Sequence, residues 1–117
     1  MDEIPGVITI APDVLLDIVR LTALATPGVI GLAADQPNRF SQMFSGKASE
    51  GIRVEIEDNS VTVDLYIVAD SDAQMLPLGQ ILQREIIRAI QDVIGMPVKL
   101  VNIHIEDITY NSLPEKV

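Results

Sequence analysis

Residues 51–69, GIRVEIEDNSVTVDLYIVA, contain two runs of alternating apolar and polar side chains around a short polar turn. Successive side chains of a β-strand point to opposite faces of a sheet, so each run predicts a strand with one buried face. The buried face is predicted to carry Ile52, Val54, Ile56, Val61, Val63, Leu65 and Ile67. The opposite face carries Arg53, Glu55, Asp64 and Tyr66. The pattern predicts a β-hairpin on which the rest of the chain packs.

Two segments with helical periodicity flank this hairpin. Residues 12–25 start with a proline and an aspartate, which are typical of the first turn of a helix, and carry apolar side chains every three or four positions. Residues 77–94 have a similar apolar stripe and are followed by Gly95 and Pro97, which commonly end helices. Both segments are predicted to be amphipathic helices.

Three further segments predict strands: residues 6–10 (GVITI), 29–33 (VIGLA) and 98–107 (VKLVNIHIED). The resulting order is β-α-β-β-β-α-β. It predicts an α+β fold, a two-layer sandwich in which two amphipathic helices cover one face of a mixed β-sheet. The same order with one strand fewer would be ferredoxin-like, so the strand order within the sheet stays open.

The length of 117 residues predicts a single domain. Its core is expected over residues 6–108, with a long polar loop at 35–50 and a frayed tail at 111–117. Hydrophobic residues make up 48% of the chain, but it contains only two Tyr, two Phe and no Trp. The core must therefore be built from aliphatic side chains, and flat ligands that need aromatic stacking are disfavoured.

The formal net charge of −9 disfavours nucleic acid and anionic lipid headgroups as direct partners, because both are negatively charged. The absence of cysteine excludes disulfides and thiolate zinc sites. The first ten residues, MDEIPGVITI, lack the basic start and long apolar run of a signal peptide. The chain also has no apolar run of about 18 residues, so we expect no membrane span, and any association with a membrane must use a surface patch or a partner. We expect a cytoplasmic protein that can lie at the cell membrane through such a partner.

No residue pattern typical of a catalytic site stands out, so we expect no enzyme activity, no cofactor and no metal. His104 is the only histidine, and alternation places it on the polar face of its strand with Asn102 and Glu106. A general base or metal ligand needs convergent partners, which favours a solvent-facing strand histidine. Asp70 and Asp72 would suit a hard cation, but aspartates are also common turn formers.

The strongest candidate for a partner interface is the segment RFSQMFSGK at residues 39–47. It gathers both phenylalanines, a methionine and two basic residues in an otherwise acidic chain: Arg39, Phe40, Met43, Phe44 and Lys47. Apolar side chains flanked by basic groups could bind a protein groove or a membrane surface. The alternative is that the phenylalanines fold back to cover the sheet or a helix end.

Four blocks, taken in order, resemble the alkaline shock protein family, whose members are also called envelope stress response proteins. They are GVITIAP at residues 6–12, PGVIGL at 27–32, VTVDLYIV at 61–68 and VNIHIEDI at 101–108. The resemblance spans about residues 6–108. Family loops before the hairpin tend to be rich in Gly, Leu and Lys, whereas this chain has DQPNRFSQMFSGKASE there.

The resemblance implies a small bacterial protein that acts near the cell envelope and offers no known catalytic or cofactor residues to carry over. Our leading hypothesis is a non-enzymatic scaffold or adaptor that self-associates, as a homo-oligomer, or binds a membrane-anchored protein partner. An alternative is a small-molecule or metal-binding module that uses Asp70, Asp72 and the polar face around His104. An RNA-binding domain would need a basic face, which the chain lacks.

Overall fold

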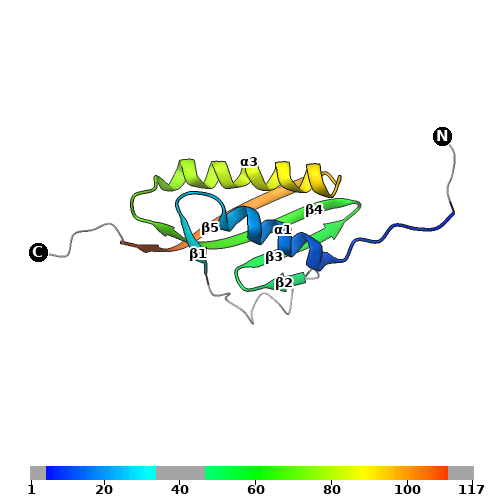
Figure 1. The fold of residues 1–117 in the computed structure, drawn as a ribbon, viewed down its shortest axis with the longest axis horizontal. Helices are drawn as coiled ribbons and strands as arrows, with labels where there is room; N and C mark the ends of the chain where they lie inside the picture. The colour runs from blue at the N-terminus through cyan, green and yellow to red at the C-terminus, as the bar shows by residue number, and fades with distance from the viewer. Residues whose placement is uncertain (1–4, 34–46, 111–117) are drawn as a thin grey trace, which may run out of the picture.

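A computed structural model describes residues 5–33 and 47–110 of the chain. The elements in chain order are α1 (Pro12–Leu24), β1 (Val29–Leu32), β2 (Lys47–Ser49), β3 (Ile52–Glu57), β4 (Ser60–Asp70), α3 (Met75–Val93) and β5 (Val98–Thr109). Figure 1 shows both helices on the same face of one sheet. The predicted α+β class, with two helices covering one face of a mixed sheet, is therefore confirmed.

The sheet is organised around β4. Along one side β4 pairs in parallel with β5, over residues 61–70. Along the other side it pairs antiparallel with β3 in its first half and with β1 in its second half. The short strand β2 continues the sheet beyond β3.

The hairpin of β3 and β4 forms as predicted, with Glu57 opposite Ser60. Ile56, which alternation predicts to be buried, is 38% exposed, because it lies near the turn, at the end of the strand. The two turn residues of the hairpin, Asp58 and Asn59, have φ angles of 53° and 63°. Two consecutive positive φ angles are the geometry of the tight turn that matches the natural twist of paired strands. Asn and Asp tolerate this conformation better than most residues do, which explains why they stand at this turn.

The core lies between the sheet and the helix layer. It is aliphatic, as the composition predicts, and its fully buried members include Leu15, Val19, Val63, Leu65, Ile67, Leu82, Ile86 and Ile90. Helix α3 starts two residues earlier than expected, because Pro77 can occupy the first turn, where the amide has no helical acceptor. Gly95, at φ 85°, follows the helix and donates its amide to the Ile90 carbonyl.

Two local predictions were wrong. Residues 6–10 do not form a strand within the described chain, and the side chains of Val7 and Ile8 are 89% and 94% exposed. A β-prone sequence becomes a strand only where a sheet edge is available to it, and α1 follows this segment directly. In addition, β2 lies inside the predicted loop 35–50. Three residues are too few to show alternation in the sequence.

Gly51 lies where β1 and β3 meet along the same side of β4. The Tyr66 amide donates to the Gly51 carbonyl at 2.8 Å, and the Tyr66 carbonyl accepts from the Ala33 amide at 2.8 Å. Gly51 has a φ of 74°, and a Cβ added there would lie 2.8 Å from the Ala33 carbonyl oxygen and 2.9 Å from the Leu32 Cβ. Only glycine fits this junction without moving the strands.

We predict that Gly51→Ala destabilises the protein by about 2–4 kcal/mol, because the strained φ and the clash with backbone atoms act together. Urea unfolding followed by circular dichroism measures the loss. Gly79→Ala is the matched control: a Cβ there meets no atom within 4 Å, and alanine in a helix is worth about 0.5–1 kcal/mol over glycine. Equal unfolding midpoints for the two variants would contradict the assignment of Gly51 as the junction.

Candidate functional site

The face of the sheet opposite the helices carries a group of polar and aromatic side chains from three strands. We call it the outer-face cluster, and its members are Arg53, Asp64, Tyr66, Asn102 and His104. Strand register brings them together: Asp64 is paired with Arg53 on one side and Asn102 on the other, and Tyr66 is paired with His104. Neighbouring pairs on one face of a sheet are close enough for side chains to interact.

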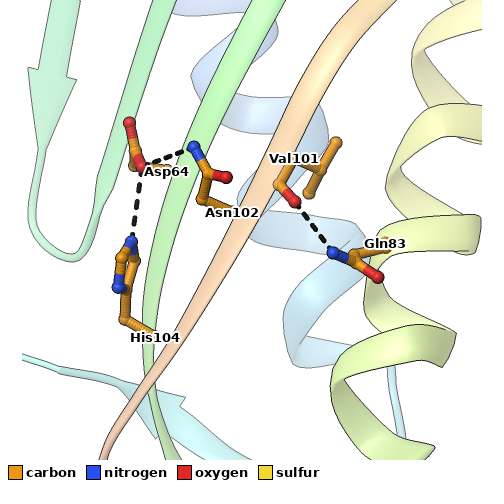
Figure 2. Close-up of polar contacts among 5 residues, drawn as sticks. All are labelled: Asp64, Gln83, Val101, Asn102 and His104. Carbon is orange, nitrogen blue, oxygen red and sulfur yellow. Dashed lines mark hydrogen bonds and ion pairs between the residues drawn. The ribbon is translucent and has the colours of Figure 1, made fainter.

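Asp64 is the polar centre of the outer-face cluster. The Asn102 Nδ2 donates a hydrogen bond of 3.1 Å to the Asp64 Oδ1, and the His104 Nε2 lies 3.3 Å from the same oxygen. Figure 2 shows both side chains of β5 reaching across to this one carboxylate on β4. The side chain of Asp64 is 20% exposed and that of His104 is 40% exposed, so the pair is partly screened by water.

The aromatic part of the outer-face cluster is a stack. The rings of Tyr66 and His104 lie 4.4 Å apart between centroids at an angle of 12°. The guanidinium carbon of Arg53 lies 5.4 Å from the Tyr66 centroid, within the range of a cation–π contact. Arg53 is only 2% exposed, although it sits on the face away from the helices. These contacts link side chains of β3, β4 and β5 at the centre of the outer face.

Sequence alternation correctly places His104 beside Asn102 on the polar face. Glu106, expected next to them, falls at an irregularity in the pairing, where Ile67 is opposite Ile105 and Val68 is opposite Asp107. Alternation within each strand also places Asp64 and Tyr66 outward. The pairing of β4 with β5 is what joins the two sets, and no feature within a single strand reveals it.

The alternative site at Asp70 and Asp72 lies apart from the outer-face cluster. The Asp72 amide donates to the Asp70 Oδ1 at 2.9 Å, which is the short-range bond of an aspartate turn. Asp70 is four residues along β4 from Tyr66, or about 13 Å, so Asp70, Asp72 and His104 do not form one site. Across the described residues, no three His, Cys, Asp or Glu side chains are grouped to hold a metal ion.

A second surface feature is an open groove of about 640 Å³ between the helices. We call it the helical groove. Its apolar lining comes from the end of α1, the turn after it and the outward side of α3: Leu21, Ala25, Pro27, Ile81, Ala89 and Val93. Glu85, Arg88 and Asp92 add charge along its α3 side. Leu21 is 67% exposed and Val93 is 68% exposed, so large apolar side chains face water here.

The interface predicted from the sequence falls outside what can be described. Arg39, Phe40, Met43 and Phe44 lie in the undescribed segment, and Lys47 belongs to β2 but its side chain is also outside the description. That interface stays a prediction. Neither described helix is long and apolar enough to cross a membrane.

Comparison with known proteins identifies the relatives of this chain. A model of the alkaline shock protein 23 family, described by a cell envelope-related function, matches residues 1–110. Spy1535, an uncharacterized protein of Streptococcus pyogenes, is 32% identical over 97% of this chain and 87% of its own length. YqhY, an uncharacterized protein of Bacillus subtilis, is 25% identical over 96% and 84%. These matches confirm the resemblance drawn from the four sequence blocks.

Solved structures share the fold at low identity. The copper form of the MamM CTD has a TM-score of 0.56 and 10% identity, and the match covers 87% of this chain and 91% of that one. A nickel form of its E289H variant has a TM-score of 0.50 and 12% identity over 81% and 96%. At such identity the likeness shows the fold alone.

We predict that Asp64→Ala lowers the free energy of unfolding by about 1–2 kcal/mol, because two partly buried donors lose their shared acceptor. Glu57→Ala, which removes an exposed carboxylate from the neighbouring strand, should change it by less than about 0.5 kcal/mol. Chemical unfolding of both variants measures the difference. A similar small change in both would mean that the outer-face cluster contributes nothing to stability.

Proposed function

The chain belongs to the alkaline shock protein 23 family, and from that premise we propose that it is a non-enzymatic scaffold or adaptor of the cell envelope. It works in the cytoplasm, at the membrane periphery, through self-association or through a membrane-anchored protein partner. Its role in a stress response belongs to the same proposal. Its surface serves to hold proteins together and performs no chemical step.

The helical groove is the observation that carries this proposal. Monomeric proteins rarely leave a grouped apolar surface in water, and such surfaces commonly mark protein interfaces. Because Leu21 and Val93 are about two-thirds exposed, they contribute little burial energy to the fold. A bound partner that covered both side chains would remove their apolar area from water. In the outer-face cluster, by comparison, the Asp64 carboxylate is already engaged by Asn102 and His104.

The shape of the helical groove favours an amphipathic helix as the partner. Small-molecule sites are usually enclosed, whereas this groove is open and runs between two helices. A helix that lies in such a groove places apolar side chains at intervals of three and four residues. Glu85, Arg88 and Asp92 offer both signs of charge beside the apolar strip, which can fix the register of a bound helix.

We expect the double variant Leu21→Ser with Val93→Ser to lose at least about tenfold in affinity for an envelope partner, because two apolar contacts are removed. Both side chains are mostly exposed, so folding should be retained. Affinity capture from cells, with the captured proteins quantified by mass spectrometry, gives the readout. Leu100→Ser is the control, since Leu100 is 51% exposed on the opposite face of the sheet. An equal loss for the control would show that the helical groove has no special role.

The segment at 39–47 is the rival interface. If Phe40 and Phe44 contact the partner, Phe40→Ser with Phe44→Ser should abolish crosslinking to it in cells while the circular dichroism spectrum is retained. If crosslinking is unchanged in that variant and lost in the helical-groove variant, the segment is not the interface. A loss of the folded spectrum would assign the phenylalanines to the core of the protein.

A further inference from the structure

The segment before α1 is an exposed, extended strand sequence. Val7 and Ile8 are 89% and 94% exposed, and Ala11, the residue that precedes the helix, has the extended angles φ −66° and ψ 139°. GVITI has three β-branched apolar residues and a threonine in five positions, which favours strand formation. We call residues 6–10 the arm. In Figure 1 the arm leads away from the sheet and the helices.

The sheet offers an edge that fits such a strand. Strand β5 pairs with β4 on one side, and among the described strands it has no partner on the other. The Val101 carbonyl accepts a hydrogen bond of 3.1 Å from the Gln83 Nε2, which places this carbonyl on the outer side of β5, toward α3 (Figure 2). Main-chain groups alternate sides along a strand, so Ile103 and Ile105 also direct their amides and carbonyls outward.

Both ends of this edge are closed by the chain's own side chains. Gln83 caps Val101 at one end, and at the other the Ile108 amide donates to the Asp107 Oδ1 at 2.8 Å. Such caps are a common way to prevent unwanted pairing at a sheet edge. The stretch between them, centred on Ile103 and Ile105, is the part that can still accept a strand.

A groove runs along this open stretch, between β5 and the start of α3. It consists of two adjoining hollows of about 290 and 420 Å³, which share Met75 and Ile105. We call it the edge groove, and its apolar lining is Met75, Leu76, Gly79, Ile103, Ile105 and Ile108. Leu76 is 81% exposed, and space is open above Gly79, where an added Cβ would meet no atom within 4 Å.

We infer that the arm of one copy adds as a strand to the β5 edge in a second copy of this chain, with alternate side chains in the edge groove. This inference rests on the proposed self-association and names its site. Ile8 and Ile10 lie on one side of the arm by alternation and face Met75 and Gly79, while Val7 and Thr9 face the other way. Added strands bind in this manner, with affinity from main-chain hydrogen bonds and specificity from alternate side chains.

The acceptor must be another copy, because the arm cannot reach its own edge groove. Helix α3 begins at the end of the molecule where β5 ends, and α1 begins toward the other end (Figure 1). The 13 residues of α1 span about 20 Å, so the start of α1 lies far from the start of α3. The five residues of the arm extend about 17 Å and lead further away from the edge groove. Donor and acceptor are different surfaces, so two copies can exchange arms reciprocally or join head to tail.

Engineered cysteines test this placement directly, since the natural chain has none. Ile8→Cys protein, mixed with Gln80→Cys protein, should form a crosslinked heterodimer with a short bis-maleimide, because Ile8 faces the edge groove in the pair and Gln80 lines it. Ile8→Cys mixed with Asp92→Cys is the control, since Asp92 lies on the helical groove. Crosslinking at Asp92 in place of Gln80 would show that the arm binds the helical groove and would overturn the inference.

Sedimentation velocity over a concentration series supplies the second test. Ile8→Ser should raise the dissociation constant of self-association at least about tenfold without unfolding, since Ile8 is 94% exposed in the single copy and faces the edge groove in the pair. Val7→Ser, on the side of the arm that faces away from the edge groove, is the control and should have a smaller effect. Gly79→Arg should have the same effect as Ile8→Ser by filling the edge groove, whereas Gly79→Ala should not.

The outcomes separate this inference from the proposed function. If the natural protein self-associates and both blocking variants associate equally well, the arm is not the contact, and the scaffold proposal stands. If the natural protein is a monomer at every concentration, the inference fails. The proposed function fails with it only when affinity capture from cells also recovers no envelope partner.

Discussion

Strand β4 is the element on which the rest of this structure depends. It pairs with β5 along one side and with both β3 and β1 along the other, so three strands take their position from it. Its inward side chains Val61, Val63, Leu65 and Ile67 are fully buried beneath the helices. Its outward side chains include Asp64 and Tyr66, to which β5 adds Asn102 and His104. One strand therefore organises the core, the outer-face cluster and, through β5, the exposed edge.

This arrangement divides the surface into parts with different physical character. On the outer face, polar and aromatic groups engage each other, with Asp64 and Tyr66 as their centres. On the helix side, apolar groups are left in water at the helical groove and the edge groove. Unburied apolar surface has a free-energy cost that an interface removes. A protein whose apolar side chains gather in open grooves is suited to binding other proteins.

The features that could be predicted from the sequence are those set by residues close together in the chain. Alternation around Asp58 and Asn59 predicts the hairpin, and helical spacing predicts α1 and α3 to within a few residues. The same rules misplace residues 6–10, because β propensity describes what a segment can do once an edge accepts it. Pairing between distant strands has no local signal, so the union of Tyr66 with His104 was not predictable. The two grooves arise from elements far apart in the chain and also needed the structure.

The central claim is that this chain acts by holding proteins together at the envelope. Crosslinking in living cells at natural expression levels, with the linked residues mapped by mass spectrometry, tests it most directly. The account predicts links that join this chain to a second copy or to an envelope protein, with linked residues beside the helical groove or the edge groove. Links confined to a single copy, with none to any other protein, would contradict it.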